Sequence, residues 1–203
     1  MTGSAIAFLR RAALVAIVAM LAACVGPAVR PEADLLAAQK AREEAIAAQS
    51  DWQFEGRIAV SDGRDGGSGA IAWRQQGATF DIEVTAPVTG HAWRLEGGPG
   101  HAVLSGLEQG EVEGEDVDDV VARALGWHVP FTELVAWVRG VRASGSAELR
   151  FGRDGLPESL VQDGWTVRFP GFDDSVSPPR PRKVFAKRGH WSVRLAVSRW
   201  TVP

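Results

Sequence analysis

The chain has 203 residues, a formal net charge of −3 and charges of both signs mixed along its length. It has no basic block or basic amphipathic helix of the kind that binds nucleic acid, and no glycine-spaced loop of a nucleotide site, so we expect neither partner. Eight tryptophans, no tyrosine and a single cysteine indicate a fold stabilised by buried apolar surface and not by disulfides.

The first segment has the pattern of a bacterial lipoprotein signal peptide. Arg10 and Arg11 precede an apolar run over residues 12–21, and two alanines then lead to Cys24. The run is shorter than the about 20 apolar residues that a membrane-spanning helix needs, so removal is favoured over a retained anchor. We therefore expect cleavage of residues 1–23, export, and a lipid on Cys24, the alternative being a stray or buried thiol.

After the cysteine, the chain predicts a tether followed by a helix. Pro31 suits the first turn of a helix, Glu32 favours its positive end, and strong helix formers continue to Gln49, although the apolar stripe is weak. We therefore expect residues 24–50 to form a lipidated tether and N-terminal helix, and residues 51–203 to form the folded domain.

From Trp52 onward, apolar residues alternate with polar ones in short segments bounded by glycine, proline or aspartate, which is the pattern of half-buried antiparallel strands. Glycine-rich hairpin turns are expected over residues 63–69 and 97–100, and a tight turn at Asp163-Gly164. The segments predict about ten or eleven strands, which is too many for one flat sheet without curling.

A helical period interrupts the strands once, between Glu115 and Gly140. Three valines and a leucine fall on one helical face that ends at Gly126, and Pro130 opens a second helix. The apolar face of this helical pair has to be covered by the sheet. We therefore expect a mainly β fold, an open antiparallel half-barrel with helices packed in its concave face.

No residue pattern predicts catalysis or metal binding. Ser68 lies in a glycine-rich stretch but does not complete the nucleophile-elbow motif. We therefore expect no enzyme, no metal and no cofactor; an enzyme acting on lipids would need Ser105 or Ser159 beside a histidine. The four histidines, which are scattered singly and not at the spacing of metal ligands, are His91, His101, His128 and His190.

Several features leave two interpretations open. The acidic run over residues 111–119 is either a solvated helix start or a docking surface for a basic partner. The loop over residues 85–90 carries Val88 where turns usually have polar residues, so its tip either folds back or projects toward something apolar. One strand leaves open whether Val103 or Leu104 faces inward. The inward aromatic residues could either fill the interior or line a cavity.

Three stretches form a set by their order and spacing. The first runs from GRIA at residues 56–59 to the loop TAPV at 85–88, and the second is LGWHVP at 125–130. The third is DGWTVRF at 163–169, followed by Trp200 near the end of the chain. Together they resemble the LolB family of outer-membrane lipoprotein-localisation receptors over nearly the whole folded domain.

The resemblance implies a function and a set of partners. Proteins of this family accept the acyl chains of lipoproteins from the soluble periplasmic carrier LolA in a hydrophobic cavity and insert them into the inner leaflet of the outer membrane. By this resemblance we expect a LolA-type carrier, acylated lipoprotein cargo and outer-membrane phospholipid as partners. We also expect a monomer that is anchored through Cys24 on the periplasmic face of the outer membrane. The alternative is a structural lipoprotein that scaffolds another outer-membrane assembly.

The resemblance also implies which residues do the work. The loop with Pro87, Val88 and Gly90 corresponds to a loop that protrudes in the family and helps insertion, with Val88 in place of the family's leucine. On the sheet and the helical pair, the side chains that we expect to line the acyl-chain cavity are Trp73, Phe80, Ile82, Val84, Trp93, Leu134, Trp137, Trp165, Val167, Trp191 and Val193.

Overall fold

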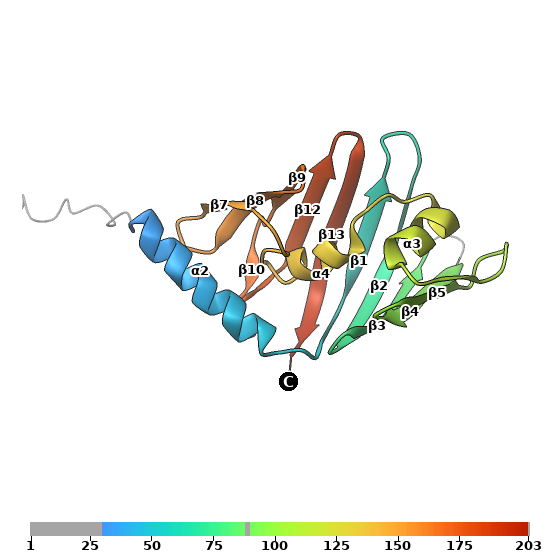
Figure 1. Ribbon diagram of the computed structural model, residues 1–203, viewed down its shortest axis with the longest axis horizontal. Coiled ribbons are helices and arrows are strands. Elements are labelled where there is room, and N and C mark those ends of the chain that lie inside the picture. Colours follow the sequence, from blue (N-terminus) through green and yellow to red (C-terminus); the bar gives the residue numbers. More distant parts are fainter. Residues whose placement is uncertain (1–29, 88–89, 203) are drawn as a thin grey trace, which may run out of the picture. The chain divides into compact units, whose positions relative to one another are not determined.

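An eleven-stranded antiparallel sheet is the framework of the fold (Figure 1). The structure, a computed structural model, describes residues 30–87 and 90–202, and the larger compact unit of the chain comprises Leu35–Pro203. In chain order the strands of the sheet are β1 (Trp52–Ser61), β2 (Gly66–Gln76), β3 (Thr79–Thr85), β4 (Ala92–Gly98), β5 (His101–Ser105), β6 (Val112–Gly114), β7 (Glu148–Phe151), β8 (Pro157–Gln162), β9 (Trp165–Arg168), β12 (Lys183–Arg188) and β13 (Trp191–Thr201).

The sheet is open. Its strand order is β6-β5-β4-β3-β2-β1-β13-β12-β9-β8-β7, so the first and last strands of the domain pair at its centre while β6 and β7 are its two edges. A second, two-stranded sheet pairs β10 (Phe172–Asp173) with β11 (Arg180–Pro181). These observations confirm the prediction of an open antiparallel sheet with about eleven strands.

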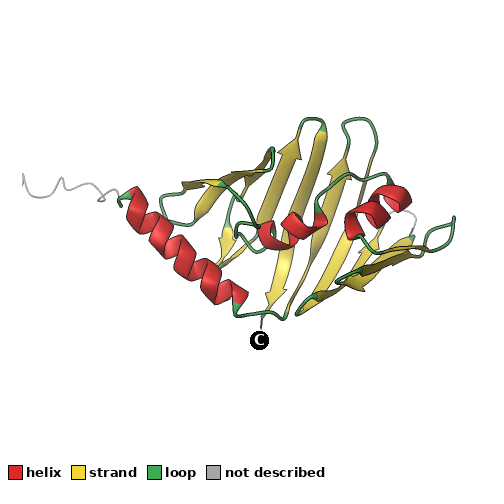
Figure 2. Cartoon of the chain, viewed as in Figure 1, coloured by secondary structure: helices red, strands yellow, loops and turns green. Residues whose placement is uncertain are grey.

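Helices α3 (Val117–Leu125) and α4 (Phe131–Trp137) cover one face of the sheet, which we call the inner face; the opposite face is the outer face (Figure 2). A longer helix, α2 (Glu32–Ala47), precedes β1 and ends close to the predicted boundary at Gln49. Within residues 30–87 and 90–202, no helix combines the length and the apolar character needed to cross a bilayer.

The ends of α3 follow from its sequence. The Asp116 carboxylate accepts a hydrogen bond from the Asp119 backbone N–H at 2.9 Å and caps the first turn. At the other end Gly126 adopts a φ of 70° and donates its N–H to the Ala122 carbonyl, which is a conformation that glycine accepts without strain. Residues 116–119 of the acidic run thus start a helix, whereas Glu113 lies in β6 (Val112–Gly114). A docking role of the run stays a prediction. The neighbouring Asp118 accepts a hydrogen bond from the Phe131 N–H at 2.8 Å and links the starts of α3 and α4.

The expected glycine-rich turn is shorter than predicted. Only residues 62–65 form the turn, because Gly66–Gly69 already pair with β1 as part of β2. The physical reason is close packing: a Cβ on Gly67 would lie 2.9 Å from the Trp127 ring. The prediction of a turn over residues 66–69 was therefore wrong. The turn predicted over residues 97–100 is also shorter, because residues 97–98 belong to β4 and only two residues remain before β5.

The apolar core lies between the inner face and the α3–α4 pair. Along β1 to β4 the buried positions alternate with exposed ones, as the period of two predicted. In β5 the structure decides between the two candidates, because Leu104 is fully buried and Val103 is half-buried. Apolar alternation therefore assigned the two faces of the sheet correctly for these central strands.

Candidate acyl-chain binding site

The eleven side chains predicted to line a cavity gather in one apolar cluster on the inner face and the helices that cover it. Trp93 and Trp191 are half-buried at its margin and the other nine are buried. The strands supply most of them because alternate residues of β2, β3, β9 and β13 point to the same face. Their assignment to a cavity stays a prediction, since these side chains contact one another in this structure.

Phe131 at the start of α4 lies against the centre of the sheet. Its ring stacks on Trp73 with centroids 5.2 Å apart, and it contacts Phe80 at 4.7 Å. Both partners are predicted lining residues, whereas Phe131 was not predicted. The sequence carried a signal for it, because Phe131 precedes Leu134 by three residues and Trp137 by six and so falls on their helical face.

Two further ring pairs join the helical segment to the sheet. Trp127, in the connection between α3 and α4, meets Trp93 edge to face with centroids 5.8 Å apart. At the end of α4, Trp137 meets Trp165 at 5.9 Å. Each pair buries large apolar faces that are suited to contact with a hydrocarbon chain.

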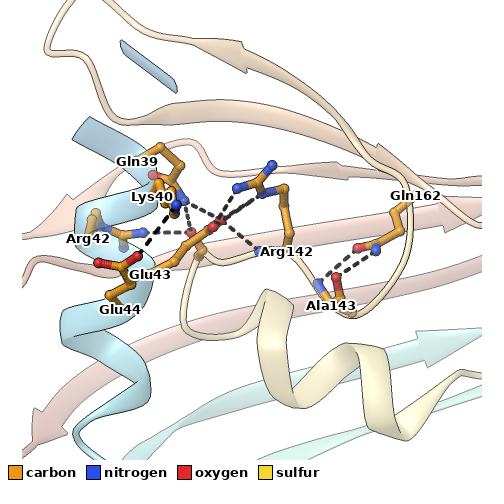
Figure 3. Close-up of polar contacts among 9 residues, drawn as sticks. Gln39, Lys40, Arg42, Glu43, Glu44, Arg142, Ala143 and Gln162 are labelled. Carbon is orange, nitrogen blue, oxygen red and sulfur yellow. Dashed lines mark hydrogen bonds and ion pairs between the residues drawn. The ribbon is translucent and has the colours of Figure 1, made fainter. Parts of the chain in front are cut away.

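A buried amide fixes the end of α4. The Trp137 Nε1–H donates to the Gln162 Oε1 at 3.2 Å, and the Gln162 Nε2 donates to the Ser144 carbonyl at 3.0 Å. Gln162 also accepts from the Ala143 N–H and donates to the Ala143 carbonyl, each at 3.0 Å (Figure 3). Gln162 occupies an inward position of β8 where the alternation called for an apolar residue. By contrast, the buried Trp165 Nε1–H has no acceptor within the part of the chain that the structure describes.

Helix α2 is held by polar contacts to the segment that follows α4 (Figure 3). Arg42 donates to the Gly140 carbonyl at 2.7 Å, to the Arg139 carbonyl at 3.1 Å and to the Pro179 carbonyl at 2.7 Å. Burial, and next the charge of Arg180, lower the pKa of Arg42 to about 10, so the guanidinium remains charged at neutral pH. This arginine therefore connects α2 to two loops that are about 100 and 140 residues away in sequence.

An ion pair lies beside these contacts. Arg142 binds Glu43 through two nitrogens, with Nη2 to Oε2 at 2.6 Å and Nε to Oε1 at 3.0 Å. Burial alone would raise the pKa of Glu43, but the hydrogen bonds from Arg142 and Gln39 lower it below its ordinary value. The sequence pattern did not predict this pair, because its two residues lie 99 positions apart.

The predicted insertion loop is only partly described. Pro87 and Gly90 are exposed, and a hydrogen bond from the Ala86 N–H to the His91 carbonyl at 2.8 Å closes the loop at its base. Val88 and Cys24 lie outside the described residues. The role of Pro87, Val88 and Gly90 in membrane insertion therefore stays a prediction.

The predicted alternative chemistries find no cluster to support them. Within the described ranges, no group of three or more histidine, cysteine, aspartate or glutamate side chains could hold a metal ion. Ser105 ends β5, and Ser159 lies opposite Arg168 in the pairing of β8 with β9. His128 and His190 both contact the Trp191 ring.

The fold defines the class of protein, an open half-barrel of the LolA type with helices on its inner face. A LolA superfamily protein from Nitrosomonas europaea superposes with a TM-score of 0.53 over 81% of this chain and 93% of its own, at 10% identity. A putative outer membrane lipoprotein-sorting protein domain from Vibrio parahaemolyticus gives a TM-score of 0.50 over 83% and 91%, also at 10% identity. At such low identity these likenesses concern the fold alone.

Sequence comparison identifies the family. The family model of outer membrane lipoprotein LolB matches residues 50–200. The outer-membrane lipoprotein LolB of Xanthomonas campestris pv. campestris strain B100 is 37% identical over 171 residues, which are 81% of this chain and 78% of the relative. That of Xylella fastidiosa strain 9a5c is 38% identical over 165 residues, or 80% and 76% of the two chains. The chain belongs to the LolB family of outer-membrane lipoproteins.

Proposed function

We propose that this chain is an outer-membrane-anchored lipoprotein receptor. It accepts acylated lipoproteins from a LolA-type periplasmic carrier between its helices and its sheet, and it inserts them into the inner leaflet of the outer membrane. Membership of the LolB family supports this role. A lipid on Cys24 would keep the domain on the periplasmic face of that membrane.

The observation that carries the proposal is the set of ring contacts between the inner face and the segment from Trp127 to Trp137. These contacts are apolar and largely non-directional, so a fatty chain can replace one side of them. Exposing an acyl chain of about sixteen carbons to water costs on the order of 12 kcal/mol, at about 0.8 kcal/mol per CH₂. Entry between α4 and the sheet exchanges one set of apolar contacts for another and avoids that exposure.

Release follows from the same physics. Acyl chains move from the carrier to the receptor and then to the bilayer if each environment holds them better than the one before, so ordered affinities replace an energy source. A receptor whose interior is refilled by its own aromatic rings holds the chains less tightly than one with a permanent void, because the rings compete with the cargo. This competition favours the last step, transfer to the membrane.

Trp165 adds a polar element to this site. Its indole N–H is buried and has no acceptor among the residues that the structure describes, and a donor left in that state costs free energy. A bound acyl chain begins with an ester or amide carbonyl, which can accept from this N–H. The donor would then orient the chain that the apolar surface binds without direction.

Binding of a fluorescent acyl probe tests the proposal. We expect wild type and Val161→Asp to bind alike, because Val161 is 43% exposed and pairs with Thr166 on the outer face. Trp137→Asp places a charge in the apolar interior and should abolish binding. Circular dichroism checks the fold, and Leu134→Asn provides a milder change at the same surface. If the folded Trp137→Asp and Leu134→Asn variants bound the probe as well as wild type does, the assignment of these residues to the cavity lining would be rejected.

The delivery step has its own test. Val88→Glu should still accept cargo from the carrier but transfer it poorly to liposomes, since a charge at an apolar membrane contact has to be desolvated. The exposure of Pro87 and Gly90 beside it supports a projecting loop. Unchanged delivery would mean that the loop folds back. Cys24→Ala should lose the membrane anchor and still receive cargo in solution.

A structural lipoprotein that scaffolds another outer-membrane assembly is the second candidate. The specific observation in its favour is the contact of the inner side chains with one another, because a scaffold needs a filled core. The acyl-probe experiment separates the two, since a scaffold predicts no saturable binding by wild type.

A further inference from the structure

A basic groove lies mainly on the outer face of the sheet. It borders the proposed acyl site at two residues, because Val193 is buried on the inner face and the Arg188 guanidinium lies 5.0 Å from the Trp165 ring. It has a volume of about 600 Å³ and opens over β9, β12 and β13. Four of its lining residues are cationic and none is acidic. In chain order the lining residues are Gly164, Thr166, Arg168, Phe185, Ala186, Lys187, Arg188, Gly189, Ser192, Val193 and Arg194.

Strand register builds this groove. Phe185 on the middle strand lies opposite Arg168 on one side and Arg194 on the other, so an arginine occupies the position on each side of this aromatic residue. In the next row of the same face, Lys187 lies opposite Thr166 and Ser192, which add two hydroxyl groups. Side chains directly opposite each other in an antiparallel pair have Cβ atoms about 5 Å apart, so the Cβ atoms of Arg168 and Arg194 lie about 10 Å apart across Phe185. Lys187 is two residues further along the middle strand, about 7 Å away. Long arginine and lysine side chains at these positions are within reach of one anion.

A second groove on the same face provides an internal comparison. It has a volume of about 310 Å³ and lies over β1 to β4. There Asp81 accepts from Arg94 at 2.8 Å and from Arg74 at 3.4 Å, and Arg199 pairs with Glu55 at 2.7 Å. Its charges thus neutralise one another. Among the described residues no ion pair involves a cation of the basic groove, so its positive charge remains available to an external anion.

The position of the groove indicates which anion. It includes Gly164 and Gly189, which belong to the β8–β9 and β12–β13 turns, and Arg188, which ends β12. In this antiparallel order those turns lie at the same end of the sheet as the β3–β4 loop, residues 86–91. Four strand spacings separate β3 from β12, or about 20 Å. A membrane touched by that loop therefore passes close to the groove.

We propose that the basic groove binds the phosphate of an anionic phospholipid headgroup at the membrane surface. Arg168, Arg194 and Lys187 neutralise the phosphate, the hydroxyls donate hydrogen bonds, and the Phe185 ring contacts the glycerol region. The proposal rests on the proposed function, because the β3–β4 loop supplies the other membrane contact. Two contacts about 20 Å apart orient the sheet on the bilayer, which one loop cannot do.

Vesicle flotation tests the groove. The protein is the mature chain expected after removal of residues 1–23, with Cys24→Ala, so that neither the apolar signal segment nor a lipid anchor dominates binding. The vesicles contain phosphatidylcholine with increasing fractions of phosphatidylglycerol. The test variant is Arg168→Ser/Arg194→Ser. The matched control is Arg74→Ser/Arg94→Ser, which removes the same net charge from the ion-paired groove on the same face. Neutral vesicles measure all binding that does not depend on lipid charge.

We expect the test variant to lose about 25-fold in the affinity gained from phosphatidylglycerol, at about fivefold for each basic residue near an anionic surface, and the control to lose much less. The wild-type gain should also disappear at high salt. Equal losses in the two variants would overturn the proposal, because net charge alone would then explain binding. Groove-dependent binding of polyglutamate without a phosphatidylglycerol effect would also overturn it and would assign the groove to an acidic protein.

The same variants separate this inference from the proposed function. Arg168 and Arg194 are on the outer face, so their replacement should leave acyl-probe binding unchanged. Intact acyl binding without a phosphatidylglycerol effect would overturn the groove alone. A groove-dependent phosphatidylglycerol effect in a protein that binds no acyl probe would support the groove and overturn the proposed function.

Discussion

Helix α2 and the α3–α4 pair are held in place by different kinds of contact. Helix α4 buries Phe131, Leu134 and Trp137 against the inner face, and its partners are mostly apolar rings. Helix α2 buries Gln39 and Arg42 as well as Ile46, and its long-range contacts are largely hydrogen bonds. Apolar contacts tolerate exchange of one partner for another, whereas hydrogen bonds require one geometry.

This difference assigns separate tasks to the two helical regions. The α4 surface can give up the ring contacts of Phe131 to an acyl chain without leaving polar groups unsatisfied, whereas Trp137 also donates a buried hydrogen bond to Gln162. The segment after α4 cannot move from α2 in the same way, because the Arg139 and Gly140 carbonyls would lose a charged donor at once. We therefore expect α2 to hold the C-terminal end of α4 in position while the face of α4 exchanges partners.

The largest effect should come from removing the apolar anchor. Trp137→Ala deletes a fully buried indole and leaves the Gln162 amide without that donor, so the free energy of unfolding should fall by about 3–5 kcal/mol. Urea unfolding followed by circular dichroism measures it. Leu36→Ala is the control, because Leu36 is 41% exposed on α2 and its loss should cost less than about 0.5 kcal/mol. Similar losses in both would contradict the assignment of the core.

An intermediate effect is expected at the polar anchor of α2. Arg42→Met retains much of the side-chain volume but removes the donor to three carbonyls. The free energy of unfolding should fall by about 2 kcal/mol, because the lost hydrogen bonds outweigh the gain from no longer burying a charge. Hydrogen exchange should rise in residues 139–143 more than in the sheet. Lys40→Met on the same helix is the control, since its ion pair with Glu44 is exposed and 4.0 Å long. Uniform exchange changes across the domain would argue against a local anchor.

The smallest effect concerns the Glu43–Arg142 pair and depends on pH. The folded-state pKa of Glu43 lies below its ordinary value, so the pair stabilises the fold fully above the unfolded pKa, and this contribution is lost as pH falls through the folded pKa. Glu43→Gln should therefore lower stability by about 1 kcal/mol at pH 7 and by less in acid. Denaturation midpoints of wild type and variant at several pH values measure this, and a pH-independent difference would be inconsistent with it.

Much of the fold could be predicted from local pattern. The period of two identified the strands and their inner faces, and the change to a helical period located α3 and α4 between Asp116 and Val138. Alternation did not predict Gln162 as an inward residue, because a polar side chain is accommodated there by two hydrogen bonds that it accepts and two that it donates. Nor did glycine composition reveal that Gly67 makes room for Trp127, since local sequence does not specify which ring packs on a strand.

The sequence by itself determined the inward apolar positions of the central strands, the approximate positions of the helices, and the family to which the chain is related. Only the tertiary structure decided that Phe131 meets Trp73 and Phe80, that Arg42 holds Gly140, and that Arg168 and Arg194 flank Phe185. The physical reason is that periodicity records the direction of each side chain along its own element. The partner that it meets depends on the pairing and register of segments that are far apart in the chain.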